Sequence, residues 1–424
     1  MYSLKRLFAT AAFFLLVSGC GGIMQSSKDT ATITLPENFA LRTIAQDLGN
    51  NRHIATGHNA DVYVKLGRLD KKGHGIVHLK WNKNGKQLQV ADAFGDFEGT
   101  GIVVKDGFLY ASSDENVYRY RLNADGNVMN KDNPEILITG LINRRQHASK
   151  SLALDENGNI YVNIGAPSNS CQEADRTPGS KGMMPCPILD SAGGIWQFKA
   201  DKLNQTYKDG IRYATGLRNV VGMDWDKETN ALYAMMHGRD QLNTLFPELF
   251  DENKNAELPA EEFFRIRAGG DYGWPYCYYD GLKDKKLLSP EYGGDGEMQG
   301  RCANVEQPEV VFPAHWGPNA VLFYTGNHFP EKYKNGAFVA FHGSWNRAPL
   351  SQAGYNVCFI PFKDGKPTGE YEIFASGFAG KTEFTNTRDA QYRPCGLAQT
   401  PQGTLLVSDS KNGKVWEIYF KPPR

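Results

Sequence analysis

The stretch GTLLVSDSKNGKVWEIYF (403–420) contains the pattern that decides the fold. Two apolar runs, GTLLV and KVWEIYF, are rich in β-branched and aromatic residues, and a polar segment separates them. Residues of these types favour strands, and the polar residues between the runs favour a turn. We therefore expect two consecutive strands at this place.

The same pair of runs recurs along the whole chain. The first run of the pair is found in ADVYV (60–64), DGFLYA (106–111), GNIYV (158–162), NALYA (230–234), GAFVA (336–340) and GTLLV (403–407). The second run is found in GIVHLKW (75–81), NVYRYRL (116–122), GIWQFKA (194–200), EFFRIRA (262–268), NVCFIPF (356–362) and KVWEIYF (414–420). Strand repeats of this kind bury their faces by stacking around an axis, so six copies predict an all-β, six-bladed β-propeller. A two-domain all-β protein is the alternative.

Composition narrows the functional class. The 424 residues include 47 Lys plus Arg and 47 Asp plus Glu, and this balance argues against a nucleic-acid partner. A content of 41% apolar and 12% aromatic residues supports a folded core, and the mean hydropathy of -0.48 excludes a multi-spanning membrane protein. We expect one propeller domain over residues 35–424. Its long loops should concentrate at 235–330, and loops on a rigid scaffold usually carry function.

The N-terminal stretch MYSLKRLFATAAFFLLVSGC (1–20) has the features of an export signal. Two basic residues precede an apolar run that is too short to span a bilayer comfortably. Its end, VSGC, resembles the lipobox of bacterial lipoproteins, which implies lipidation of Cys20 and a tether over 21–34. The expected location is then the bacterial cell envelope, in the periplasm or at the outer membrane, with the lipid as the only membrane contact. An ordinary secretory signal is the alternative.

Six further cysteines remain after Cys20. An even number in an exported chain favours disulfides, although free buried thiols are the alternative. Pairing of neighbours along the chain predicts Cys171–Cys186, Cys277–Cys302 and Cys358–Cys395. No CxxC or CxxCH motif occurs, so zinc ribbons and c-type haem have no support.

The segments between the repeats carry a family resemblance. They are HASKSLALDENGNIYVNIG (147–165), YATGLRNVVGMDWD (213–226), GDYGWPYCYYD (270–280), FHGSWNRAP (341–349) and YRPCGLAQTPQGTLLVSD (392–409). Together they resemble the glucose/sorbosone dehydrogenase family, in particular its sorbosone dehydrogenase branch. The resemblance covers most of residues 35–420. It implies an exported propeller that uses pyrroloquinoline quinone (PQQ) and Ca2+ to oxidise a sugar, with electrons passing to an external acceptor.

The resemblance also implies roles for individual residues. His147 matches the catalytic base, which suits a side chain whose ordinary pKa lies near neutrality. Asn169 matches a cofactor contact, although Ser168 stands where the glucose dehydrogenases have an Arg. The three carboxylates of PQQ call for guanidinium groups, and Arg347, Arg393 and, less directly, Arg52 match basic positions of the family.

Two stretches are candidates for calcium. The resemblance points to His237, Gly238, Arg239 and Asp240, which would bind the ion largely through backbone carbonyls. Separately, residues 251–262 place Asp251, Asn253, Asn255, Glu257 and Glu262 at the ligand positions of an EF-hand-like loop. Ala256 replaces the glycine of that loop and Pro259 interrupts it, so a plain polar insertion is the alternative.

Aromatic side chains could form the walls of a sugar site. Trp274, Pro275, Tyr276 and Trp345 are the candidates, and burial in the core is the competing interpretation. His315, His342 and Trp316 could face the same pocket. Fold alone does not fix function. A calcium-dependent hydrolase of the lactonase type and a non-catalytic lipoprotein that binds glycans or partners are therefore the alternatives to the dehydrogenase.

Overall fold

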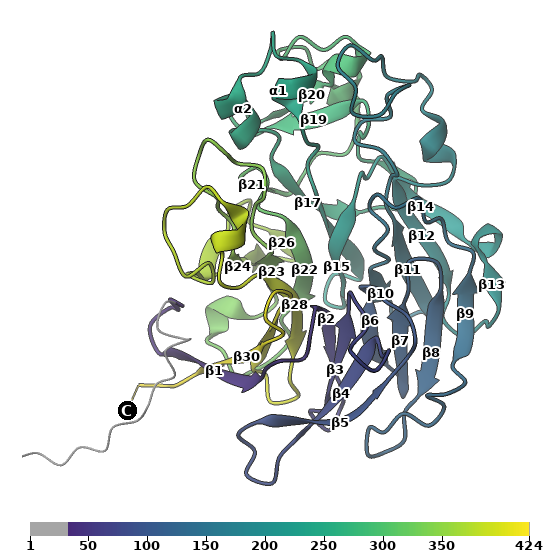
Figure 1. Ribbon diagram of the computed structural model, residues 1–424, viewed down its shortest axis with the longest axis vertical. Coiled ribbons are helices and arrows are strands. Elements are labelled where there is room, and N and C mark those ends of the chain that lie inside the picture. Colours follow the sequence, from purple (N-terminus) through teal and green to yellow (C-terminus); the bar gives the residue numbers. More distant parts are fainter. Residues whose placement is uncertain (1–32, 424) are drawn as a thin grey trace, which may run out of the picture.

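The computed structural model describes residues 33–423, in which six sheets surround a central channel (Figure 1). The export signal, Cys20 and nearly all of the tether lie outside the described residues. Each sheet contributes its first strand to the channel wall, and these six strands contact one another in a closed ring. The predicted six-bladed β-propeller is confirmed.

The first three blades follow one another from the N-terminal side, and the strands of each blade run from the channel outward in chain order. Blade 1 consists of β2 (Asn51–Thr56), β3 (Val62–Leu66), β4 (Ile76–Trp81) and β5 (Leu88–Phe94). Blade 2 consists of β6 (Ile102–Lys105), β7 (Phe108–Ser112), β8 (Val117–Arg121), β9 (Glu135–Thr139) and β13 (Gln205–Thr206). Blade 3 consists of β10 (Leu152–Leu154), β11 (Asn159–Ile164), β12 (Gly194–Lys199), β14 (Ile211–Thr215) and β18 (Gly270–Asp271).

The last three blades complete the ring. Blade 4 consists of β15 (Val220–Asp226), β16 (Ala231–Met236), β17 (Glu261–Ile266) and β21 (Val310–Phe312). Blade 5 consists of β22 (Pro318–Phe323), β23 (Ala337–Phe341), β24 (Asn356–Ile360) and β27 (Glu372–Ala375). Blade 6 consists of β28 (Pro394–Gln399), β29 (Leu405–Asp409), β30 (Val415–Phe420) and β1 (Phe39–Ala45), so the N-terminal strand is the outer strand of the last blade.

The second strands of the blades explain why the repeat is visible in the sequence. Strands β11, β16, β23 and β29 are buried along their whole length. Each lies between two neighbouring blades, so both of its faces pack against apolar side chains and its sequence is a continuous apolar run. The outer strand β5, by contrast, has three exposed residues in its centre and leaves a weaker pattern.

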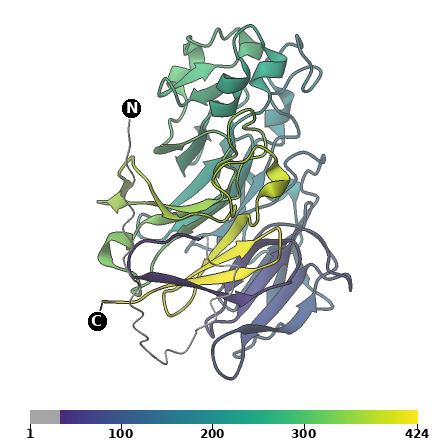
Figure 2. The ribbon, with the colours of Figure 1, turned by 60° about the vertical axis from the view of Figure 1, so that its left-hand side comes forward.

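A cap stands on one end of the ring, at the top of Figures 1 and 2. We define it as residues 239–260 and 272–304, the segments before and after β17 and β18. It contains α1 (Leu242–Leu245), α2 (Glu252–Glu257), the hairpin of β19 (Cys277–Asp280) and β20 (Lys285–Leu288), η3 (Pro290–Tyr292) and η4 (Gly300–Asn304). The surplus residues expected at 235–330 thus build much of this cap.

Small elements complete the described chain. They are the hairpin of β25 (Phe362–Lys363) and β26 (Lys366–Pro367), and the single turns η1 (Pro187–Asp190), η2 (Tyr207–Asp209), η5 (Glu331–Tyr333) and η6 (Thr387–Asp389). Across residues 33–423, no helix has both the length and the apolar character needed to cross a membrane.

Two of the three predicted disulfides form. Cys171–Cys186 closes the loop between β11 and β12, and Cys277–Cys302 closes the second segment of the cap. The third predicted pair is wrong, because Cys358 and Cys395 are both free and buried. Cys358 packs among apolar residues between blades 4 and 5, whereas the sulfur of Cys395 accepts a hydrogen bond from Asn319 on the inner strand of blade 5.

Candidate active site

Polar side chains gather where the chain enters the inner strands, at the end of the channel that the cap covers. Arg52 lies at the start of β2, Thr100 precedes β6 and Ser149 precedes β10. Arg52 Nε donates to Thr100 Oγ1 (3.3 Å), and Thr100 Oγ1 donates to Ser149 Oγ (3.1 Å). Hydrogen bonds therefore link the starts of the inner strands of blades 1, 2 and 3. Arg218 precedes β15 and Arg393 precedes β28. The fold therefore collects residues from the whole sequence at one channel mouth.

A cavity of about 270 Å³ opens at this mouth between blades 3, 4 and 5. Side chains from several loops line it, including His147, Arg218, Asn219, Glu261, Trp345 and Asn346. Its convergent polar groups, which come from several loops at the channel mouth, make it the candidate active site.

His147 is positioned with one ring nitrogen committed to the backbone. Its Nδ1 lies 2.5 Å from the carbonyl oxygen of Ala166, which can only accept, so the neutral ring carries its proton on Nδ1. Nε2 is then the lone-pair nitrogen. Burial, and next the positive charge of Arg218, lower the pKa of His147 to about 3. The ring is consequently a neutral base at ordinary pH.

Arg218 is the electrostatic centre of the cavity. It is only 3% exposed, and its guanidinium donates to Asn169 O (3.1 Å), Asn169 Oδ1 (3.0 Å), Gly238 O (2.9 Å) and Asp240 Oδ2 (2.8 Å). One buried cation thus holds the β11–β12 loop and the β16–β17 loop in fixed relation.

A buried carboxyl group forms part of the cavity wall. Glu261 at the start of β17 accepts hydrogen bonds from Gly238 N (2.9 Å) and Gly317 N (3.0 Å). Burial raises its pKa to about 7, and the two backbone donors oppose that shift. Glu261 therefore fastens the β16–β17 loop to the entry of β22.

A second group of cations lies beside the cavity. Burial first, then the positive charges of Arg393 and Arg52, hold the pKa of His342 well below its ordinary value. Arg393 donates to the carbonyl oxygens of His342 (3.4 Å) and Gly343 (3.2 Å) and to the hydroxyl of Tyr355 (3.4 Å). Among the described residues the hydrogen-bond partners of the Arg393 guanidinium are all neutral groups, and the Arg52 guanidinium donates to a hydroxyl, so neither side chain is paired with a carboxylate.

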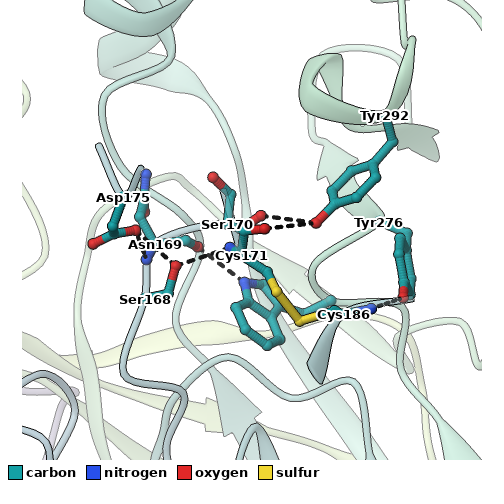
Figure 3. The surroundings of a disulfide bond; sticks show 9 residues. Ser168, Asn169, Ser170, Cys171, Asp175, Cys186, Tyr276 and Tyr292 are labelled. Carbon is teal, nitrogen blue, oxygen red and sulfur yellow. Dashed lines mark hydrogen bonds between the residues drawn. A yellow bond between two sulfur atoms is a disulfide. The ribbon is translucent and has the colours of Figure 1, made fainter. Parts of the chain in front are cut away.

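Asn169 lies next to the first disulfide, in the surroundings that Figure 3 shows. Its backbone N–H and the hydroxyl of Ser168 both donate to Asp175 Oδ1, at 2.9 and 2.7 Å. The side-chain amide of Asn169 donates to Asp240 O (2.9 Å). The backbone carbonyl oxygen of Asn169 accepts from the indole N–H of Trp274 (2.9 Å). Ser168 therefore has a structural role here, and Trp274, which is 3% exposed, supports Asn169 from the core and forms no sugar wall.

Arg347 and Arg393 were both predicted to bind the cofactor, but the structure places them at different sites. Arg347 Nη1 donates to Ala256 O (2.9 Å) and Ala314 O (3.1 Å), and the side chain lines an outer groove next to the cap. It does not reach the central cavity, because these carbonyls hold it on the outer side of the β23–β24 loop. Trp345, two residues earlier, lines the cavity itself.

The predicted calcium stretch at 237–240 is engaged by protein donors. His237 Nε2 lies 2.8 Å from Pro318 O, and Arg239 forms a buried ion pair with Glu291. The carbonyl oxygen of Gly238 faces the guanidinium of Arg218, and that of Asp240 faces the amide of Asn169. This arrangement of cation and N–H donors does not fit a bound calcium ion.

The EF-hand-like interpretation of residues 251–262 is wrong. Residues Glu252–Glu257 form helix α2, and Asp251 caps it by accepting from Lys254 N (2.7 Å). Glu262 lies on β17 and pairs with buried Lys286 at 3.1 Å. Within residues 33–423, no group of three or more His, Cys, Asp or Glu side chains could hold a metal ion.

Sequence reasoning missed the two groups that organise the cavity. Arg218 stands in GLRN, which looks like an ordinary turn between strands, and Glu261 stands at the polar start of a predicted strand. A signal was present in both cases, because each charged residue stands two positions before an apolar run and is expensive to bury there without a partner. His315 was singled out correctly as facing the pocket.

Comparisons with known proteins agree with this architecture. A model of the TrAA12-like family matches residues 33–421. An uncharacterised protein of Borreliella burgdorferi is 24% identical over 412 residues, which cover 92% of each chain. A pyrroloquinoline quinone-dependent sugar dehydrogenase of Hypocrea jecorina is 23% identical over 337 residues, which cover 76% of this chain and 73% of that protein. The iodide structure of the Trichoderma reesei AA12 carbohydrate-active enzyme superposes with a TM-score of 0.74 at 20% identity, over 92% of this chain and 98% of that one.

Proposed function

The chain belongs to the TrAA12-like family, and we propose that it is a PQQ-dependent sugar dehydrogenase. The similarity to a PQQ-dependent sugar dehydrogenase supports the cofactor and the substrate class. The observation that carries the proposal is the geometry of His147, a neutral ring with its free nitrogen in a cavity lined by polar groups. The lactonase alternative would need a site of side-chain carboxylates, which the described residues do not provide.

The residues around the cavity fit an anionic cofactor. Arg393 and Arg52 are cations whose partners are neutral, so their charge is left for an external anion. PQQ carries three carboxylates, and guanidinium groups are the donors that bind carboxylates best. Asn169 and Arg218 both bond to Asp240, which lines the cavity. We assign Arg52 and Arg393 to the carboxylates of PQQ.

The bound quinone would supply the two-electron acceptor for oxidation of a sugar carbon. His147 accepts the proton of the reacting hydroxyl at Nε2, because its Nδ1 is fixed on Ala166 O. Arg218 holds Asn169 and Asp240 in place and keeps the imidazole neutral by its charge. The cavity walls orient the sugar, and an external acceptor takes the electrons.

Calcium and cellular location complete the proposal. Calcium enters only through the sequence resemblance, and we assign the ion no step in the reaction, because the carbonyl oxygens of Gly238 and Asp240 already accept from Arg218 and Asn169. An exported protein in the cell envelope, anchored through Cys20, is consistent with the two disulfides, which persist in oxidising compartments. A panel of sugars that includes sorbosone identifies the substrate.

Reconstitution tests the proposed function. The purified protein is titrated with PQQ in the presence of Ca2+ and in the presence of a chelator, and dye reduction is followed with a panel of aldoses and sorbosone. We expect PQQ binding and sugar-dependent dye reduction. Failure to bind PQQ under both conditions would overturn the proposal, and activity in the presence of the chelator would remove calcium from it.

The two arginines should separate in a measurement of cofactor affinity. Arg393→Ala is expected to weaken PQQ binding by about 10- to 100-fold, the effect of losing a charge-assisted contact. Arg347→Ala is the matched control and should leave the Kd within about threefold, because its guanidinium faces Ala256 and Ala314. Fluorescence or calorimetric titration with PQQ measures both. A larger loss in Arg347→Ala than in Arg393→Ala would contradict this assignment.

A further inference from the structure

Trp345 is an exposed indole on the wall of a polar cavity. Its side chain is 62% exposed, whereas Trp274 and Trp316 are buried. It belongs to the β23–β24 loop, and it lines the same cavity as His147 and Arg218. Its exposure leaves a rigid aromatic face against which a molecule in the cavity can pack.

The loop holds this indole in place from both sides. On the inner side, Asn346 Nδ2 donates to Asp240 Oδ1 (3.0 Å), and Asp240 is itself paired with Arg218. On the outer side, Arg347 donates to the carbonyl oxygens of Ala256 and Ala314. The two residues that follow Trp345 are thus anchored to two other segments, the cap segment 239–260 and the stretch before β22, so the exposure of the indole is a feature of a fixed loop.

A second observation points to a ligand with hydroxyl groups. Asn346 lines the cavity, and its Oδ1 is buried and has no hydrogen-bond partner among the described residues. Its orientation is fixed, because Asp240 can only accept and therefore requires the NH2 end of the amide. A buried acceptor without a donor costs free energy, and a ligand O–H would satisfy it.

From these contacts we infer that Trp345 and Asn346 form the binding platform for a sugar in its pyranose form. The apolar C–H face of the ring packs on the indole, and a ring hydroxyl donates to Asn346 Oδ1. An aromatic side chain suits such a ligand because it supplies rigid apolar area with a small entropic cost. The inference rests on the proposed function for the identity of the reaction, and on the cavity alone for the binding.

Direct binding tests the platform without turnover. D-Glucose and D-xylose are added to the PQQ-free protein, and magnetisation transfer from the protein to the sugar C–H protons is measured by saturation-transfer NMR. We expect transfer to one face of the ring in the wild type, about a tenfold loss in Trp345→Ala, and an intermediate signal in Trp345→Phe. Ile211→Ala is the matched control, since Ile211 is 66% exposed on an outer strand of blade 3 and should not change the signal.

Kinetics of the reconstituted enzyme give the second measurement. Trp345→Ala should raise KM for the sugar about tenfold with a smaller change in kcat and an unchanged Kd for PQQ. Wild-type transfer that is absent, or equal in Trp345→Ala, would overturn the platform. Trp345-dependent transfer in a protein that binds no PQQ would support the platform and reject the proposed function, so the two failures are distinguishable.

Discussion

Replacing His147 by alanine is expected to lower kcat by about 10²- to 10⁴-fold, the usual contribution of a general base. The ring is the neutral base of the cavity, and its Nδ1 is already committed to Ala166 O, so no other tautomer competes for the reacting proton. PQQ affinity should stay within about threefold, because the cofactor carboxylates are assigned to the arginines. Turnover measured with the reconstituted enzyme, together with a PQQ titration, checks both statements.

The control and the pH dependence sharpen this prediction. His58→Ala should keep full activity, because His58 is exposed and its Nε2 contacts the carbonyl oxygen of Ala124, away from the cavity. The pKa of His147 lies near 3 in the folded protein, below its ordinary value, so the imidazole should stay neutral from pH 8 down to pH 5. NMR of the ring protons in the PQQ-free protein measures this. Full activity of His147→Ala, or titration of the ring near pH 6.5, would contradict the role.

Replacing Arg218 by methionine is expected to destabilise the protein by about 3–5 kcal/mol, the cost of leaving one charge of a buried pair without its partner. Asp240 would keep Asn346 at 3.0 Å and Arg176 at 3.4 Å, but the carbonyl oxygen of Gly238 would lose its donor and that of Asn169 would keep only Trp274. Urea unfolding measures the change in the free energy of unfolding. Turnover should fall as well, because the loops that carry Asn169 and Asp240 lose their common anchor.

An exposed ion pair provides the comparison for Arg218. Lys332 and Glu372 form a pair at 3.2 Å, with both side chains well exposed. Lys332→Met should change the free energy of unfolding by less than about 1 kcal/mol, since solvent screens such pairs. The pKa of His147 should rise in Arg218→Met, because the nearby positive charge that helps to lower it is gone. An equal loss of stability in the two variants would show that burial does not matter at Arg218.

The strands that the sequence predicts are those packed between blades. NALYA (230–234) overlaps β16, and GAFVA (336–340) overlaps β23, because a strand buried on both faces must be apolar throughout. The inner strands gave no such pattern. Strand β10 has three residues, and several inner strands are interrupted by bulges next to the channel, so periodicity could not locate them.

The site was predicted as far as single motifs allow. The family resemblance pointed to His147 and Asn169, and aromatic character pointed to Trp345, but neither could tell which way a loop arginine points. Arg347 and Arg218 stand in equally polar motifs. Only the fold shows that Arg347 bonds to backbone carbonyls outside the cavity, whereas Arg218 bonds to Asp240 in the cavity wall. Likewise, pairing by sequence proximity works for cysteines within one loop and fails for Cys358 and Cys395, which lie on different blades.

The position of the N-terminal strand has a consequence for folding of the protein. Strand β1 pairs with β30, with Phe39 opposite Phe420, so the first strand of the described chain can pair only after the last strand has formed. Contacts between such distant residues are the slowest to form in a folding chain. The earlier blades can assemble one after another, but the last blade stays incomplete until residues 415–420 join it. Truncation at the C-terminus would therefore leave an unpaired edge at each side of the gap, which is the kind of surface that chaperones protect from aggregation.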